Sequence, residues 1–255
     1  MLAPPSLTRR HALFLDFDGT LVDIAAQPQA VQVRPDVVAS LRALHEALGG
    51  AVAIVTGRTA ADIDRFLAPL HLPLACEHGA RYRLGDRSGG VAALRLQPVL
   101  DALRPLLQRH PELRAEPKNA GIALHYRQAP QLEALCRQAL EGALRCVPGA
   151  ELLQGKCVLE VKPTAVSKGG AILRFMDEPL FTGRVPLFIG DDVTDESGFV
   201  VVQSRGGLGI KVGDGATQAL ARLESPPALR AWLAGAAAAL AGPRLPRAAA
   251  GEGAR

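Results

Sequence analysis

Near the N-terminus, the chain reads Ala12-Leu13-Phe14-Leu15-Asp16-Phe17-Asp18-Gly19-Thr20. The apolar run from Ala12 to Phe17 does not alternate with polar residues, which favours a strand buried on both faces of a parallel sheet. Residues i and i+2 of an extended segment point to the same side. We therefore predict that Asp16 and Asp18 lie together on one side, where the first strand ends.

The same pattern recurs along the chain, in short apolar runs that end at Asp, Thr or Gly. Further strands are predicted at residues 51–55, 74–76, 185–189 and 208–212. Helices are predicted between them, at residues 35–48, 59–67, 167–176, 195–202, 217–223 and 227–240. This alternation predicts the α/β fold class, with a Rossmann-like, doubly wound parallel sheet that binds ligands at the carboxyl ends of its strands.

The middle of the chain interrupts this alternation. A helix at 97–109, two strand-like runs around a turn at Lys118-Asn119, a helix at 130–144 and a strand at 157–162 indicate an inserted α+β domain. We expect residues 1–82 and 164–241 to form the two parts of the core and residues 83–163 to form the insertion. The segment 242–255 is rich in Gly, Ala, Pro and Arg and is predicted to be disordered.

Composition argues against several classes of protein. The net charge of +4 suits an anionic substrate, or a basic surface with no specific role. Lys and Arg are scattered and aromatic residues are few, so no nucleic-acid-binding face is indicated. The four Cys form no C-x-x-C pair, which argues against a zinc site and indicates reduced thiols. Without a signal peptide or an apolar stretch of about 18 residues, we expect a cytoplasmic protein that binds no membrane.

Asp16 and Asp18 are the first candidate functional residues. Two close carboxylates repel each other, and Mg²⁺ removes that conflict because it prefers carboxylate, water and phosphate oxygens. Gly19 permits a tight turn with open backbone N–H groups, and Thr20 offers a hydroxyl, so both suit a phosphate. The alternative is an ordinary Asp/Gly turn after a strand.

A second acidic stretch, Gly190-Asp191-Asp192-Val193-Thr194-Asp195, follows the predicted strand at 185–189. We expect Asp191 to be a direct metal ligand and Asp192 and Asp195 to support the metal site. The alternative is a helix N-cap with an acidic first turn.

Two further turns supply groups that can bind an anion. Thr56-Gly57-Arg58 ends the second strand, where a hydroxyl and a helix N-terminus favour phosphate, although a plain strand-to-helix turn would look the same. Lys168 opens a helix and can neutralise both phosphate and Asp16, unless it is a solvated surface lysine. The four motifs should converge on one crevice because each lies at a strand end or a helix start.

These motifs together resemble the haloacid dehalogenase-like phosphatase superfamily. The match comprises Asp16 to Thr20, Thr56, Lys168 and the acidic stretch from Gly190 to Asp195. A closer resemblance is to the trehalose-6-phosphate phosphatases. It rests also on Glu77-His78-Gly79-Ala80, His125-Tyr126-Arg127 and Leu159-Glu160-Val161-Lys162-Pro163. The resemblance implies that the insertion is a cap domain that closes over a sugar.

The resemblance also implies roles for single residues. Glu160 and Lys162 would bind sugar hydroxyls, and further substrate contacts are expected from Gly57, Arg58, His78, Lys118, His125 and Arg127. From the residues alone, Glu160 and Lys162 are an i, i+2 pair on one strand face, which fits a polyol or a surface ion pair of little energetic value. His125 fits equally well as a strand histidine, and Glu77-His78 as a plain loop.

The implied activity is the magnesium-dependent hydrolysis of trehalose 6-phosphate in trehalose biosynthesis, by a monomer. Asp16 would form an aspartyl-phosphate, and Asp18 would protonate the leaving sugar oxygen and then activate water. Mg²⁺ would be held by Asp16, Asp191 and the Asp18 carbonyl, while Thr56 and Lys168 stabilise the transferred oxygens. The alternatives are a phosphatase for another sugar phosphate, such as sucrose 6-phosphate, a phosphomutase of the same fold, and a non-catalytic sensor.

Overall fold

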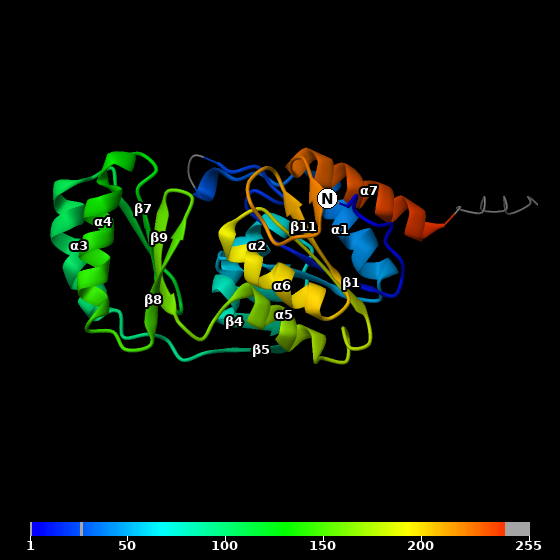
Figure 1. Cartoon of the computed structure of the whole chain (residues 1–255), viewed down its shortest axis with the longest axis horizontal. Helices are drawn as coiled ribbons and strands as arrows, with labels where there is room; N and C mark the ends of the chain where they lie inside the picture. The colour runs from blue at the N-terminus through cyan, green and yellow to red at the C-terminus, as the bar shows by residue number, and fades with distance from the viewer. Residues whose placement is uncertain (1, 26–27, 243–255) are drawn as a thin grey trace, which may run out of the picture.

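The computed structural model describes residues 2–25 and 28–242 and contains two β-sheets (Figure 1). The larger sheet has eight strands in the order β12-β11-β10-β1-β2-β3-β4-β5, and the smaller sheet has four in the order β6-β7-β9-β8. The smaller sheet and its helices lie to one side of the larger sheet, and the chain crosses between the two units near Gly90 and Pro163.

The strands are short and the helices lie mainly between them. The strands are β1 (His11–Leu15), β2 (Val52–Val55), β3 (Leu74–Cys76), β4 (Arg81–Leu84), β5 (Arg87–Gly90), β6 (Arg114–Pro117), β7 (Ile122–His125), β8 (Ala150–Gly155), β9 (Val158–Pro163), β10 (Val185–Gly190), β11 (Leu208–Val212) and β12 (Ala221–Leu223). The α-helices are α1 (Pro35–Ala47), α2 (Ala60–Leu67), α3 (Gln97–Arg109), α4 (Glu133–Leu144), α5 (Lys168–Met176), α6 (Glu196–Ser204) and α7 (Pro226–Ala241). Short 3₁₀ turns lie at Pro28–Ala30, Glu77–Gly79, Pro130–Leu132 and Val193–Asp195.

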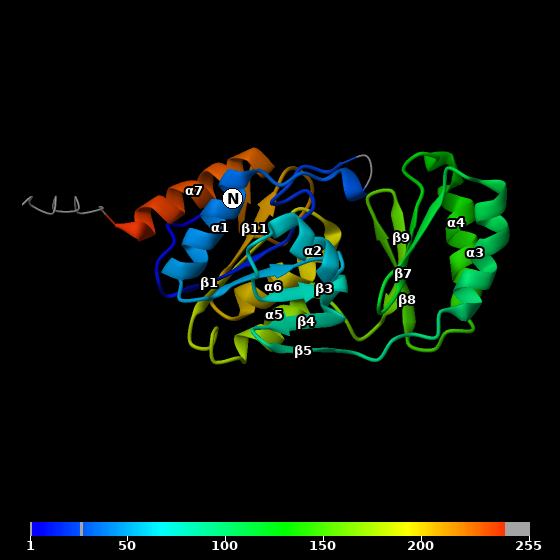
Figure 2. The ribbon, with the colours of Figure 1, turned by 180° about the vertical axis from the view of Figure 1, so that it is seen from behind.

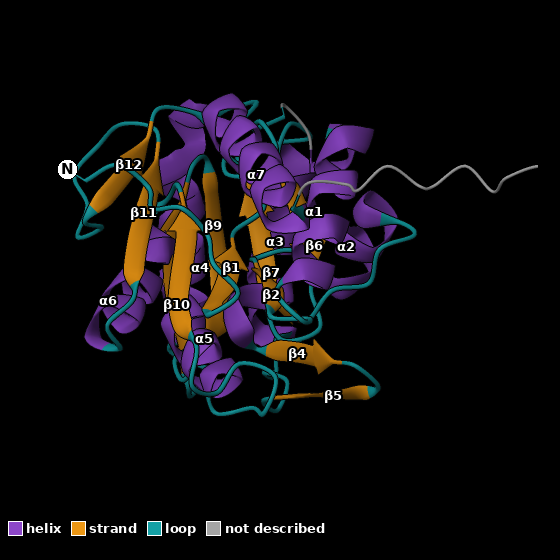
Figure 3. Cartoon of the chain, turned by 90° about the vertical axis from the view of Figure 1, so that its right-hand side faces the viewer, coloured by secondary structure: helices purple, strands orange, loops and turns teal. Residues whose placement is uncertain are grey.

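The six strands from β12 to β3 run parallel, which confirms the predicted doubly wound α/β core. Side chains of β1 alternate between two hydrophobic clusters. Leu13 and Leu15 pack toward α1, α2 and α7, whereas Phe14 packs toward α5 and α6 on the other face (Figure 3). Because β1 is buried on both faces, it reads as an unbroken apolar run in the sequence.

The boundary that we predicted after residue 82 falls inside β4. Strands β4 and β5 form an antiparallel hairpin at the edge of the larger sheet. Its residues are mostly polar, and Arg83 is held by a two-point ion pair with Asp64 of α2, at 2.8 and 2.6 Å. An edge hairpin with one solvated face carries no apolar run, so the sequence pattern does not reveal it. We propose that the inserted unit begins after Gly90.

The smaller unit packs α3 and α4 on one face of its sheet, and the other face is turned toward the core (Figures 1 and 2). Its hydrophobic core joins Leu103 and Leu140 of the helices to Leu124 and Leu159 of the strands. The helix predicted at 97–109 has those bounds, and the helix predicted at 130–144 is α4 preceded by a 3₁₀ turn. Strand β8 was not predicted.

Two predicted helix starts are confirmed at their N-caps. The Thr59 hydroxyl accepts a hydrogen bond from the Asp62 N–H, and the Ser167 hydroxyl accepts one from the Gly170 N–H. The helix predicted at 217–223 is wrong, because Ala221–Leu223 pairs with β11 as an edge strand. Beyond Gly242, the segment predicted to be disordered lies outside the described residues. Within the described part of the chain, no helix has both the length and the apolar character needed to cross a bilayer.

Candidate active site

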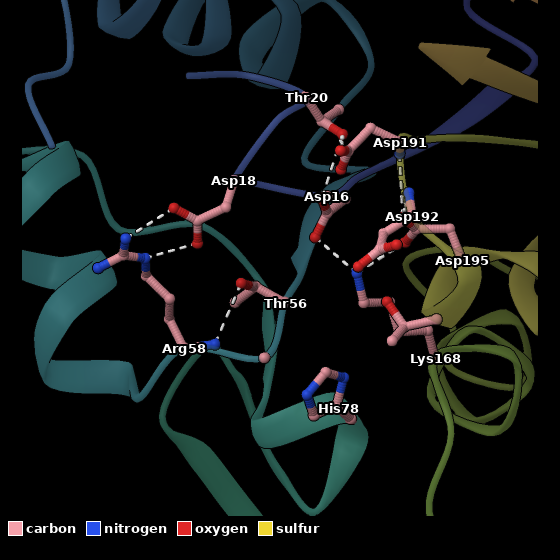
Figure 4. Close-up of polar contacts among 12 residues, drawn as sticks. Asp16, Asp18, Thr20, Thr56, Arg58, His78, Lys168, Asp191, Asp192 and Asp195 are labelled. Carbon is pink, nitrogen blue, oxygen red and sulfur yellow. Dashed lines mark hydrogen bonds and ion pairs between the residues drawn. The ribbon is translucent and has the colours of Figure 1, made fainter. Parts of the chain in front are cut away.

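Four predicted segments meet at the carboxyl ends of the parallel strands (Figure 4). Asp16 follows β1, Thr56 follows β2, Asp191 follows β10, and Lys168 begins α5. They line the floor of a cavity of about 480 Å³ that lies between the two units. The cavity is also lined by the candidate residues Asp18, Gly57, Arg58, His78, Lys118, His125, Arg127, Glu160 and Asp192.

Asp16 is buried and pairs with Lys168. The Lys168 ammonium donates to Asp16 Oδ1 and to Asp195 Oδ1, each at 2.6 Å. Burial alone would lower the pKa of Lys168, but the two carboxylates raise it, so this lysine stays charged. Burial raises the pKa of Asp16 well above its ordinary value; Lys168 opposes this shift, and the carboxylates of Asp195 and Asp191 add to it.

Asp191 faces Asp16 across the Thr20 hydroxyl, which lies 3.1 Å from Asp16 Oδ2 and 3.4 Å from Asp191 Oδ1. Gly19 leaves room for the Asp191 carboxylate, because a Cβ atom at Gly19 would lie 2.2 Å from Asp191 Oδ2. The Asp191 main chain is fixed as well: its N–H donates to Asp195 Oδ2 at 3.0 Å, and its carbonyl accepts from Lys211 Nζ at 2.6 Å. Gly19 and Thr20 thus shape the carboxylate pair and lie outside the cavity lining.

The carboxylates fit a hard divalent cation. Oxygen atoms of Asp16, Asp191 and Asp195 all lie within 4.8 Å of one another, and all three residues are buried. Asp195 already binds Lys168 and the N–H groups of Asp191 and Asp192, so it is suited to support the site and less suited to be a direct ligand. A cation between Asp16 and Asp191 would relieve the repulsion that raises the pKa of Asp16.

Asp18 does not share the position of Asp16. Its carboxylate turns away from Asp16 and Lys168 and forms a two-point ion pair with Arg58, with both N···O distances at 2.6 Å (Figure 4). The strand ends at Leu15 and the chain turns at Phe17, so the extended i, i+2 geometry behind our prediction does not apply to the two carboxylates, although both line the cavity. Arg58 in turn stacks on Phe66, with the guanidinium carbon 5.0 Å from the ring centre.

A buried polar cluster joins the two units above the floor of the cavity. Glu160 of β9 lies 2.8 Å from Lys118 Nζ and 3.1 Å from His78 Nε2. Burial raises the pKa of Glu160, but Lys118 and His78 outweigh it and hold that pKa well below its ordinary value. Burial lowers the pKa of His78. Gly57 permits this contact, since a Cβ atom there would lie 2.6 Å from His78 Nε2.

Glu77 provides a second connection between the units. Its buried carboxylate accepts hydrogen bonds from Asn119 Nδ2 at 2.6 Å and from the Ala120 N–H at 2.7 Å. Glu77 and His78 both have positive φ, at 51° and 57°. The loop after β3 therefore has a defined conformation held by hydrogen bonds, and it is not the plain loop that the sequence also allowed.

Other expected substrate residues occupy different positions. Lys162 lies outside the cavity lining, because it is two residues further along β9 and its ammonium bonds Glu151 and the Val166 carbonyl, the latter at 2.7 Å. His125 pairs with Glu116 at 2.7 Å, and this bond lowers the pKa of Glu116. Arg127 donates to the Lys156 carbonyl at 2.7 Å.

Sequence reasoning missed several charged residues of the site, among them Glu116, Lys156 and Lys211. Glu116 lines the cavity beside His125, Lys156 reaches Asp191 Oδ2 at 2.5 Å, and Lys211 holds the Asp191 carbonyl. Lys211 lies on β11, and one charged residue within an apolar strand was an available signal. The signal for Glu116 was weaker. Glu116 stands two residues before Lys118, so its side chain faces the same side of an extended chain as that of Lys118.

Comparisons with known proteins agree with this geometry. Residues 14–226 match the profile of the trehalose-phosphatase family. A trehalose-6-phosphate phosphatase of Escherichia coli is 41% identical over 234 residues, which cover 90% of this chain and 87% of that protein. A probable trehalose-phosphate phosphatase of Sinorhizobium fredii is also 41% identical, over 88% of this chain and 86% of its own length. The crystal structure of a trehalose-6-phosphate phosphatase related protein matches with a TM-score of 0.74 and 28% identity, over 89% of this chain and 97% of that one.

Proposed function

Because the chain belongs to the trehalose-phosphatase family, we propose that it hydrolyses trehalose 6-phosphate to trehalose and phosphate. One observation carries this proposal. A buried Asp16, paired with a charged Lys168, lies at the floor of a cavity whose opposite wall carries Glu116, Lys118 and Glu160. Such a cavity offers a nucleophile for phosphorus at one end and hydrogen-bonding partners for sugar hydroxyls at the other.

The chemistry follows from two carboxylates with different surroundings. An Asp16 oxygen attacks phosphorus while the bond from phosphorus to the sugar oxygen breaks. Asp18, which must first take up a proton and break one of its two bonds to Arg58, gives that oxygen the proton. Water then attacks the phosphorus of the aspartyl-phosphate, gives a proton to Asp18, and leaves free phosphate and Asp16. Lys168 and the Thr56 hydroxyl stabilise negative charge on the transferred oxygens.

The cation is proposed to be Mg²⁺, held by Asp16 and Asp191 with Asp195 and Asp192 in support. The buried all-oxygen donor set supports this choice. When bound, Mg²⁺ would reduce the repulsion between the carboxylates and the anionic phosphate.

Recognition of the sugar is assigned to the smaller unit. Glu160 and Glu116 offer carboxylate acceptors, and Lys118 and His125 offer donors, all along one wall of the cavity. A disaccharide presents many hydroxyl groups that both donate and accept, so a wall of mixed charge suits it. The active form is proposed to be a monomer, and light scattering of the purified protein tests this point.

Phosphate release from trehalose 6-phosphate, sucrose 6-phosphate and glucose 6-phosphate, each with and without Mg²⁺, tests the proposal. We expect the first to be preferred and chelation of the metal to abolish turnover. Asp16→Asn should reduce kcat by about a thousandfold or more, because it removes the nucleophile. Retained turnover in that variant, or a preference for another substrate, would contradict the mechanism or the substrate assignment respectively.

A further inference from the structure

The β8–β9 turn of the smaller unit reaches the carboxylates at the floor of the active site. Gly155 and Val158 pair across this turn, which leaves Lys156 and Cys157 at its tip. The tip is fixed at its main chain: Arg127 binds the Lys156 carbonyl at 2.7 Å, and the Tyr126 N–H binds the Cys157 carbonyl at 3.1 Å. Cys157 takes a positive φ of 62°, so the turn has a defined shape that aims the neighbouring lysine.

From this tip, the Lys156 ammonium crosses to the larger unit and lies 2.5 Å from Asp191 Oδ2. Asp191 is one of the two carboxylates best suited to bind a cation, and Oδ1 of the same group already accepts from Thr20. The ammonium therefore binds the same carboxylate group that a cation between Asp16 and Asp191 would use. A monovalent ammonium and a divalent cation compete for this carboxylate, since both seek the same negative charge.

The two partners differ in their freedom to move. The Asp191 side chain is 6% exposed and confined by Gly19, whereas the Lys156 side chain is 49% exposed on a flexible stem. Lys156 can therefore turn away while Asp191 stays in place. Both residues also line a second cavity of about 520 Å³, whose wall carries Asp23, Glu196 and Asp214, so a cation has an acidic approach to Asp191.

We propose that Lys156, which is carried by the smaller unit, is an exchangeable counterion of Asp191. It pairs with Asp191 when no cation is bound, and it turns to the substrate phosphate when a cation binds the Asp191 carboxylate. The second half rests on the proposed function, because it needs a phosphate at the floor of the larger cavity, which Lys156 also lines. In this role Lys156 is a positioning residue through which the smaller unit responds to loading of the metal site.

The first test uses no substrate. Mn²⁺ binding to the metal-free protein is measured by electron paramagnetic resonance for wild type, Lys156→Met and Arg104→Met. Arg104 lies on α3 of the same unit, is exposed, and pairs only within its helix in the described contacts, so it matches the loss of one charge. We expect Lys156→Met to bind Mn²⁺ about five- to tenfold more tightly, as suits removal of a competing ion pair, and Arg104→Met to stay within about twofold of wild type.

The second test measures orthophosphate binding by calorimetry in saturating Mg²⁺. We expect Lys156→Met to bind orthophosphate about tenfold more weakly and Lys156→Arg to bind it nearly as wild type does, because a charge-assisted hydrogen bond is lost only in the first variant. Unchanged or weaker Mn²⁺ binding by Lys156→Met would overturn the proposal, as would unchanged orthophosphate binding. If the protein did not hydrolyse trehalose 6-phosphate, the Mn²⁺ result would still stand. The counterion role of Lys156 and the proposed substrate can therefore be tested separately.

Discussion

The Nζ atom of Lys118 lies 2.9 Å from the carbonyl oxygen of Gly57, so a side chain of the smaller unit is bonded to the main chain beside Thr56. The same ammonium lies 2.8 Å from Glu160 Oε2, and the Lys118 side chain is only 7% exposed. Lys118 thus connects the cavity wall proposed to bind the sugar to the main chain beside Thr56, where the phosphate is proposed to bind. Its loss should affect sugar binding more than chemistry.

For Lys118→Met, we expect KM for trehalose 6-phosphate to rise about thirtyfold, because buried charge-assisted hydrogen bonds are each worth roughly 2 kcal/mol. The kcat value should stay within about threefold, since no reacting atom is touched. Steady-state kinetics measures both values. Inhibition by orthophosphate is the internal control and should not change. A fall in kcat with constant KM would refute the prediction that Lys118 contributes to sugar binding and not to the chemical step.

Arg58→Lys tests the orientation of Asp18. A lysine keeps the charge but cannot form the two-point pair, so we expect kcat for trehalose 6-phosphate to fall about tenfold or more. An aryl phosphate with a good leaving group needs no proton from Asp18 and should lose much less rate in its first step.

Arg65→Lys is the matched control for that variant. Arg65 also stacks on Phe66, at 4.6 Å, but pairs with Asp62 at the surface. Equal losses for both substrates, or a comparable loss in Arg65→Lys, would show that Arg58 acts through packing and not through Asp18.

Gly19→Ala should weaken metal binding. Its Cβ atom would lie 2.2 Å from Asp191 Oδ2 and push that carboxylate from its place. We expect the Mg²⁺ concentration for half-maximal activity to rise by about tenfold or more, as a displaced ligand requires. Gly85→Ala is the control, because Gly85 also has a positive φ but no atom within 4 Å. It should cost only the backbone strain, roughly 1 kcal/mol, with normal Mg²⁺ dependence.

Glu160 should contribute a pH-dependent part of the stability. Its pKa is lowered in the folded protein from an ordinary value near 4.5, so its contribution is complete above that pH and is lost as pH falls through lower values. Between about pH 4.5 and 3, wild type should lose up to roughly 1.4 kcal/mol per pH unit from this group, and Glu160→Gln should lose correspondingly less. Urea unfolding across this range measures the difference; parallel curves for both proteins would contradict the prediction.

The catalytic floor was predictable because topology alone brings its parts together. Asp16, Thr56 and Asp191 end neighbouring parallel strands, and Lys168 begins the helix after the insertion, so correct strand and helix assignments suffice. Asp16 and Asp18 line the same cavity, as predicted, but the strand ends at Leu15, and the Asp18 carboxylate is directed to Arg58, a contact that the spacing does not reveal.

The opposite wall was less predictable because it depends on how two units dock. Lys156 meets Asp191 only through the shape of a two-residue turn, and a lone lysine in a turn carries no signal of that contact. Lys162 shares a strand face with Glu160, but the cavity ends before it and Glu151 provides its partner. The predicted boundary after residue 82 divides the β4–β5 hairpin because its polar edge strands lack an apolar run.

The twisted loop at Glu77 and His78 has an energetic consequence for the working cycle. Two residues at positive φ cost about 1–3 kcal/mol each, and the bonds from Asn119 and Ala120 to Glu77 help to offset that cost only while the units touch. Separation of the two units would leave the buried Glu77 carboxylate without both of its donors, while the backbone strain at Glu77 and His78 would remain. These contacts therefore favour the arrangement in which the two units touch, and any separation of the units must overcome their loss.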